Sequence, residues 1–315
     1  MGPRSNPEPA TNRNPSDPGL ARLLKGFSIE VMPRTAEKIP DFRAILPAGT
    51  LVYVAHIEGT PIRDMVRTAR RIRSEGFSVM PHFPARVIPD RPTLKDWISR
   101  YQDEAGVDSA LLLAGGVSAP IGDFRDSMQL LETGLFGAAG FSRLHVAGHP
   151  EGNRDIESDG SSDQADTALL WKQRFSESSD AAMAIVTQFC FDAEPVVRWT
   201  RRIQEMGVSL PVHVGVAGPA RLQTLIRFAL SCGVGNSLRI LQRRARDVTR
   251  LMKPFEPDSF LKGIDRLQAT EPAGNIVGVH FFPLGGIATC SRWILENGGD
   301  AVQPEPTHSS RRSAP

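Results

Sequence analysis

Short apolar runs alternate with longer amphipathic segments along most of this chain. In the first run, Phe27, Ile29 and Val31 alternate with polar positions, which is the period-two pattern of a β-strand. Most of the later runs are nearly continuous apolar stretches, as expected for parallel strands that helices cover. The pattern predicts strands over 27–32, 51–55, 77–81, 109–113, 143–147, 184–189, 211–215 and 278–282.

The segments between these runs carry the three-to-four-residue period of helices. Successive strands are mostly about 25 to 40 residues apart, which leaves room for one helix and two connections. Strand–helix alternation repeated eight times predicts a single α/β domain, a (β/α)8 TIM-type barrel over 19–297. The stretch 215–278 is too long for one helix and predicts extra helices between strands seven and eight. The predicted helices cover 62–74, 93–105, 125–133, 165–175, 194–204, 219–231, 237–246 and 257–268.

Composition narrows the class of protein without identifying it. Apolar residues make up 40%, charged residues 23%, and the net charge is +2, so neither nucleic acid nor a membrane is indicated as a partner. The three cysteines form no CxxC pair and favour a reducing cytoplasm. The ends, 1–18 and 298–315, are rich in Pro, Ser and Gly and are predicted to be disordered, with no secretory signal at the start.

Polar residues gather where the predicted strands end, and a barrel brings those ends to one rim. Glu30 is the carboxylate, and it could also be a solvated glutamate on an edge strand. The histidines allow a metal-dependent hydrolase using His56, His82 and His149. Carboxylates are scarce on the rim and no His-x-His lies on the first strand, so no metal is predicted. The rim residues are Glu30, His56, His82, Ala114, Gly115, Gly116, His145, His149, Gln188, His213 and His280.

Four short motifs on these strands, taken in their order and spacing, resemble a known family. They are Phe27-x-x-Glu30-x-x-Pro33-Arg34-Thr35, Pro81-His82, Val-Ala-Gly-His-Pro-Glu at 146–151, and Val-Thr-Gln-Phe-Cys-Phe-Asp at 186–192. Together they resemble the methylenetetrahydrofolate reductases, which are flavoprotein barrels. The resemblance implies FAD as cofactor, NADH or NADPH as electron donor and a folate substrate. It also implies a homo-oligomer, because family members are often oligomeric.

The resemblance assigns roles to three residues at the folate. Glu30 is implied to be the general acid that protonates N10 when the one-carbon bridge opens. A glutamate that holds a proton near neutral pH needs a raised pKa, and its apolar neighbours Ile29 and Val31 agree with that expectation. Gln188 is implied to hydrogen-bond the pterin, and Gln223 to make a second folate contact.

The implied flavin contacts lie on several loops, and the chain departs from the family among them. The family has an Arg-Gly-Asp sequence after strand four, so Gly116 replaces its aspartate, and Gly286 replaces an arginine near the folate tail. These losses leave a second hypothesis open, a folate-binding barrel that has lost FAD and serves as a binding module or partner subunit. The implied flavin contacts are Ala55, His82, Ala114, Gly115, Gly116, His149, Asn153, Lys172 and Arg174.

Overall fold

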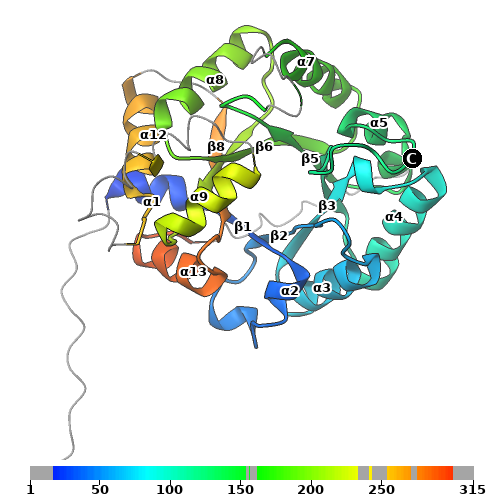
Figure 1. Ribbon diagram of the computed structural model, residues 1–315, viewed down its shortest axis with the longest axis horizontal. Coiled ribbons are helices and arrows are strands. Elements are labelled where there is room, and N and C mark those ends of the chain that lie inside the picture. The colour runs from blue at the N-terminus through cyan, green and yellow to red at the C-terminus, as the bar shows by residue number, and fades with distance from the viewer. Residues whose placement is uncertain are drawn as a thin grey trace, which may run out of the picture.

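A computed structural model describes residues 17–153, 156, 162–232, 241–242, 254–270 and 275–300. Eight parallel strands pair in chain order, and β8 closes on β1, so the predicted (β/α)8 barrel is confirmed (Figure 1). Each strand lies where the apolar runs predict one. The strands are β1 Ser28–Val31, β2 Leu51–Val54, β3 Ser78–Pro84, β4 Ser109–Leu113, β5 Arg143–Gly148, β6 Ala182–Cys190, β7 Val212–Ala217 and β8 Ile276–Phe282.

Helices surround the barrel, and their apolar faces pack against the outward side chains of the strands. The predicted helix over 62–74 matches α3 at both ends. Short 3-10 turns cover Phe42–Ala44 and Ala85–Val87. The helices are α1 Pro18–Leu24, α2 Pro33–Ala36, α3 Ile62–Ser74, α4 Arg91–Ala105, α5 Ser127–Glu132, α6 Leu135–Ala138, α7 Asp163–Glu177, α8 Ala193–Glu205, α9 Leu222–Ser231, α12 Asp258–Thr270 and α13 Ile287–Glu296.

The described residues between β7 and β8 include two helices, α9 and α12, as the length of that stretch predicts. In Figure 1, α12 stands in the outer ring between α8 and α1, whereas α9 crosses the barrel. Leu222 and Leu225 of α9 belong to an apolar cluster with Phe189 and Phe191, at the carboxyl end of β6. Helix α9 therefore covers part of the barrel opening near β6. The helix predicted over 237–246 lies almost entirely outside the described residues.

The start of the described chain forms a helix that the sequence pattern did not predict. Asp17 accepts a hydrogen bond from Gly19 N (3.1 Å) and begins α1, whose Leu20, Leu23 and Leu24 are buried. Arg22 pairs with Asp265 of α12 at 2.6 Å. The rest of the first stretch expected to be disordered, 1–16, lies outside the described residues. Of the tail expected to be disordered, 298–315, the first three residues are described, and Asp300 O accepts a hydrogen bond from Gly26 N at 2.7 Å, so this part of the expectation is wrong. Residues 301–315 lie outside the described residues.

The inward faces of the strands build the interior of the barrel, which we call the lumen. Its apolar part is small and consists of Tyr53, Met80, Leu111 and Val186, with Leu51 and Leu113 packed against them. Polar side chains fill much of the remaining space, because β1, β2, β3, β5, β7 and β8 contribute Ser28, Glu30, Tyr53, His82, His145, His213 and His280. None of the helices in the described part of the chain has the length and hydropathy needed to span a membrane.

Candidate functional site

Glu30 lies between two histidines in the lumen, close to the carboxyl end of β1. Its side chain is 19% exposed, and its Oε2 atom is 3.3 Å from His82 Nε2 and 4.0 Å from His280 Nε2. Neither Nε2 atom makes a hydrogen bond within the described residues, so the contacts are electrostatic. Ser28 Oγ is 2.9 Å from His280 Nδ1 and orients that ring. A carboxylate held between two imidazoles is well placed to exchange a proton with them.

The two histidines decide the charge of Glu30. Burial raises the pKa of its carboxyl group, but His280 and His82 outweigh burial and lower the pKa to about 2. Burial lowers the pKa of His280, against the opposing effect of Glu30. The expectation of a raised pKa for Glu30 is therefore wrong for this unliganded protein. Ile29 and Val31 belong to the outer core and do not surround the carboxylate.

A second group of polar side chains lies next to this pair. Tyr53 is fully buried, its hydroxyl is 2.6 Å from His145 Nδ1, and its ring centroid is 4.3 Å from that of His280. The His145 ring stacks on His213 with 5.4 Å between centroids. Burial raises the pKa of Tyr53 and lowers the pKa of His145 well below its usual value. The sequence interpretation missed Tyr53, although its inward position follows from its register partner, Glu30.

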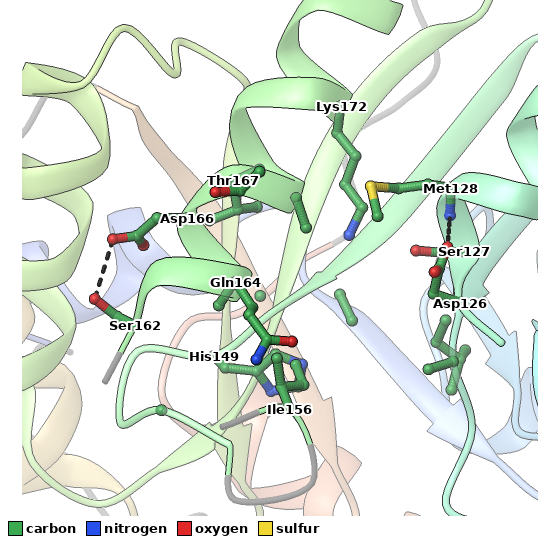
Figure 2. Close-up of a pocket in the computed structure, with 18 of the residues that line it drawn as sticks. Asp126, Ser127, Met128, His149, Ile156, Ser162, Gln164, Asp166, Thr167 and Lys172 are labelled. Atoms are coloured by element: carbon green, nitrogen blue, oxygen red, sulfur yellow. Dashed lines mark hydrogen bonds between the residues drawn. The ribbon is translucent and has the colours of Figure 1, made fainter. Parts of the chain in front are cut away.

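A cavity of about 730 Å³ opens beside the carboxyl ends of β4 and β5 and is bounded by α5 and α7. It includes three of the implied flavin contacts, Ala114, His149 and Lys172. Figure 2 shows the Lys172 side chain reaching from α7 into the cavity, with Asp126 on one side of its amino group and Gln164 and His149 on the other. Among the cationic side chains that line it, Arg86, Arg125 and Arg202 were not among the sequence candidates.

Burial destabilises the charged form of Lys172. Its side chain is buried, and burial lowers the pKa of its amino group to about 8, with Asp126 opposing the change. The Asp126 carboxylate also caps α5, because it accepts hydrogen bonds from Met128 N (2.8 Å) and Gln129 N (3.1 Å). Burial and the charge of Lys172 lower the pKa of His149 to about 4, so that ring is neutral at pH 7. A buried cation facing a cavity suits an anionic ligand such as a diphosphate.

The other implied flavin contacts lie outside this cavity. Ala55 is buried just after β2, and His82 belongs to the pair with Glu30. Gly115 adopts φ +99°, a backbone conformation that favours glycine, and a side chain at Gly116 would meet open space. Asn153 is half-buried on the loop after β5, and Arg174 is exposed on α7. Their contact with a flavin stays a prediction.

The two implied folate contacts lie on neighbouring parts of the barrel. Gln188 sits at an irregularity of β6, where the register with β7 shifts between Val186 and Phe189. Its Oε1 accepts a hydrogen bond from Phe189 N at 3.0 Å, so the amide is turned back onto its own strand. Bulges of this kind often re-aim a side chain next to an active site. Gln223 is exposed in the first turn of α9.

The histidines of the hydrolase alternative do not assemble into a metal site. His56 stacks on Trp97 with 4.9 Å between centroids, and its Nε2 is 3.0 Å from Thr60 O. His149 faces the cavity, and His82 faces Glu30. Within the described ranges, no group of three or more His, Cys, Asp or Glu side chains is arranged to hold a metal ion.

Comparison with known proteins supports the fold. No family model matches this chain. The chain is similar, at TM-score 0.52 and 9% identity, to an uncharacterized protein from Clostridium thermocellum that binds two copies of 5-methyl-5,6,7,8-tetrahydrofolic acid. The match covers 89% of this chain and 96% of that one. At such identity the likeness shows the barrel fold alone.

Two further solved structures have lower TM-scores. One is DHPS from Yersinia pestis with a pterine-sulfa conjugate, at TM-score 0.44 and 11% identity, covering 89% of this chain and 94% of that one. The other is a putative chitinase A from Streptomyces coelicolor, at TM-score 0.44 and 10% identity, covering 87% and 99%.

Proposed function

We propose that this protein is a flavin-dependent oxidoreductase that interconverts 5,10-methylenetetrahydrofolate and 5-methyltetrahydrofolate, with NADH or NADPH as electron donor. The observation that carries the proposal is the part-exposed Glu30 carboxylate between His82 and His280 at the carboxyl end of the strands. The motif resemblance to methylenetetrahydrofolate reductases supports it. So does the shared fold with a protein that binds 5-methyltetrahydrofolic acid.

The proton that opens the one-carbon bridge would come from this trio of side chains. In the unliganded protein Glu30 is ionised, because its pKa is about 2. A folate ring lying over the opening would exclude water from the carboxylate, which disfavours the charged form and raises its pKa. Glu30 would then take up a proton at Oε2 as the folate binds and deliver it to N10 of the folate. Part exposure of Glu30 allows such direct contact.

The cavity between α5 and α7 would hold one part of FAD, because the buried cation Lys172 faces it. Lys172 would pair with the diphosphate, and Ala114 would allow close approach of the backbone at the end of β4. When bound, FAD would supply the route for hydride transfer between the nicotinamide and the folate. The chain's own residues would bind the cofactor and position the folate near Glu30.

The proposal is tested by separating the two half-reactions. Purified protein given FAD, NADH and methylenetetrahydrofolate should form 5-methyltetrahydrofolate. Glu30→Gln should slow the folate half-reaction by about 10²-fold or more, because the amide cannot donate a proton as an acid, while flavin reduction by NADH is retained. Glu104→Gln, an exposed change on α4, is the matched control. Equal loss of both half-reactions in Glu30→Gln would refute the acid role.

A second candidate is a folate-binding barrel without flavin chemistry. The observation that favours it is Gly116, which is exposed and faces open space where the resembled family has an aspartate. In that case the protein should bind 5-methyltetrahydrofolate in calorimetry while FAD gives no saturable quenching. Saturable FAD binding with a flavin spectrum would exclude this candidate.

A further inference from the structure

Strand β6 carries one extra residue where it pairs with β7. The register of the two strands shifts between Val186 and Phe189. Over that shift, Thr187 and Gln188 of β6 lie opposite the single residue Val214 of β7. Such a bulge interrupts the backbone ladder, and other hydrogen bonds must hold the chain in place there.

The Thr187 hydroxyl makes two of these hydrogen bonds. Its Oγ1 atom accepts a hydrogen bond from Gly215 N at 2.8 Å and donates one to Gln188 O at 2.9 Å. The Thr187 side chain is buried. A buried backbone N–H that loses its acceptor is destabilising, so the hydroxyl stabilises the bulge by linking β7 to the extra residue.

The bulge lies close to the Glu30 site. Gly215 is the register partner of Phe189 on one side and of His280 on the other. A Cβ at Gly215 would meet the Thr187 carbonyl oxygen at 2.3 Å, so the bulged backbone occupies the space of a side chain at this position. The bulge therefore extends over β7 towards the strand that carries His280.

The extra residue also reverses which side chains of β6 face the barrel opening. Before the bulge, Val186 faces the lumen. After it, Phe189 and Phe191 belong to the apolar cluster that α9 covers, whereas Cys190 belongs to the outer core. Without the extra residue, the alternation of a strand would turn Cys190 inward. The bulge thus decides which side chains of β6 lie at the opening.

The same bulge fixes the direction of the Gln188 carboxamide. A backbone N–H can only donate, so the amide oxygen is the atom that faces Phe189 N, at 3.0 Å. Gln188 is half-buried, and its Nε2 atom makes no hydrogen bond to the residues that the structure describes. The free end of this side chain is therefore its N–H2 group, which is a hydrogen-bond donor.

We propose that Thr187 is a positioning residue: it holds the β6 bulge and thereby presents the Gln188 N–H2 group to an acceptor atom of the ligand that binds beside Glu30. The identity of that ligand as a folate rests on the proposed function. The pterin ring of a folate has a carbonyl oxygen and ring nitrogens that can accept such a hydrogen bond. Thr187 acts through Gln188 and through the shape of the strand.

The first test removes the Thr187 hydroxyl and then restores it. Thr187→Val keeps the shape of the side chain, and it should raise the KM for methylenetetrahydrofolate and the Kd of 5-methyltetrahydrofolate by about tenfold, with flavin reduction by NADH unchanged. Thr187→Ser keeps the hydroxyl and should restore both values. Thr200→Val is the matched control, since Thr200 is also fully buried and its hydroxyl donates to Val197 O at 2.9 Å in α8.

Two outcomes of this test would overturn the proposal. One is an equal change of KM and Kd in Thr187→Val and Thr200→Val, which would show a general loss of stability. The other is a serine variant that behaves like the valine variant. Thr187→Ala takes the place of Thr187→Val if the valine variant does not fold.

The second test concerns the direction of the Gln188 amide. Gln188→Glu keeps an oxygen that accepts from Phe189 N and replaces only the N–H2 end. At pH 8 it should weaken binding of 5-methyltetrahydrofolate by about 100-fold, and more than Gln188→Leu does, because a carboxylate oxygen would face an acceptor of the ligand. Binding by Gln188→Glu that is as tight as in the wild type would overturn the donor role.

Amide hydrogen exchange in the unliganded protein provides a measurement that needs no reaction. Thr187→Val should speed exchange at Gly215 N and Phe189 N by about tenfold or more, whereas Thr187→Ser and Thr200→Val should leave both rates unchanged. Unchanged rates in Thr187→Val would overturn the proposal even if folate binding falls. If the wild-type protein neither binds nor reduces a folate, the proposed function fails, and the exchange rates alone decide whether Thr187 holds the bulge.

Discussion

Lys172→Met should stabilise the protein and impair its cavity at the same time. The folded state holds the Lys172 amino group with a pKa near 8, against 10.5 for an ordinary lysine. At about 1.4 kcal/mol per pKa unit, carrying this charge costs about 3 kcal/mol of folding free energy at neutral pH. Methionine has a similar shape and no charge, so the variant should have a higher free energy of unfolding by up to about 3 kcal/mol.

The pH dependence of the free energy of unfolding shows whether the charge of Lys172 causes the stability difference between the variant and the wild type. Below pH 8 the lysine is charged in both the folded and the unfolded protein, so its full cost is present. Between pH 8 and 10.5 it is neutral when folded but still charged when unfolded, and the cost fades; above 10.5 it is absent. Urea unfolding of both proteins between neutral and alkaline pH should therefore give curves that converge. Lys95→Met, an exposed change on α4, should show no such difference.

Lys172→Met should bind anionic ligands more weakly than the wild type, although it is more stable. Removing a charge-assisted contact should weaken pyrophosphate or FAD binding by about 10- to 100-fold, measured by calorimetry and by flavin fluorescence quenching. A variant that is no more stable than wild type at pH 7 would show that Lys172 is well solvated. A variant that is more stable but binds pyrophosphate and FAD unchanged would remove the cavity from the flavin site.

Two further predictions concern the β6 irregularity and acid stability. A Cβ at Gly215 would lie 2.3 Å from Thr187 O and 2.7 Å from the Gln188 carbonyl. Gly215→Ala should therefore lower the free energy of unfolding by about 1 to 3 kcal/mol, whereas Gly137→Ala, where a Cβ meets open space, should not. Equal urea midpoints for Gly215→Ala and the wild type would show that β6 shifts to accommodate the added methyl group. The pKa values near 4 of His56, His149 and His213 mean that their unfolded forms bind protons below pH 6.5 while the folded forms do not. Urea unfolding should therefore show stability falling from pH 6.5 towards 4, by up to about 1.4 kcal/mol per pH unit for each histidine. Glu30 should add a further loss between pH 4.5 and 2, and a flat profile would contradict this reasoning.

The sequence reveals elements whose cause is local. Strand β4 and helix α3 have their predicted bounds because each is set by its own apolar pattern and flanking residues. Helix α1 was missed although Leu20, Leu23 and Leu24 form one helical face, because the polar, proline-rich residues before it favoured a disordered interpretation. The sequence therefore predicts the position of an element where its apolar pattern is not adjoined by a segment that favours disorder.

The candidate site depends on contacts that no local pattern contains. The pKa of Glu30 was expected to follow its neighbours Ile29 and Val31, but adjacent residues on a strand face opposite sides. The histidines that set this pKa come from β3 and β8. Tyr53 and His145 are 92 positions apart and meet only because the barrel closes. Lys172 was chosen by resemblance, while its burial is a property of how α7 packs.

Because the barrel closes between its first and last strands, the site can form only after the last strand has been synthesised. Ser28 and His280 are 252 positions apart, and the junction of the first and last strands pairs only Ser28 with His280 and Ile29 with Phe281. Contacts of such long range form slowly during folding. Synthesis must pass β8 before the environment of Glu30 can exist, so a nascent chain lacking that strand would display the carboxylate to water with one of its two histidines absent.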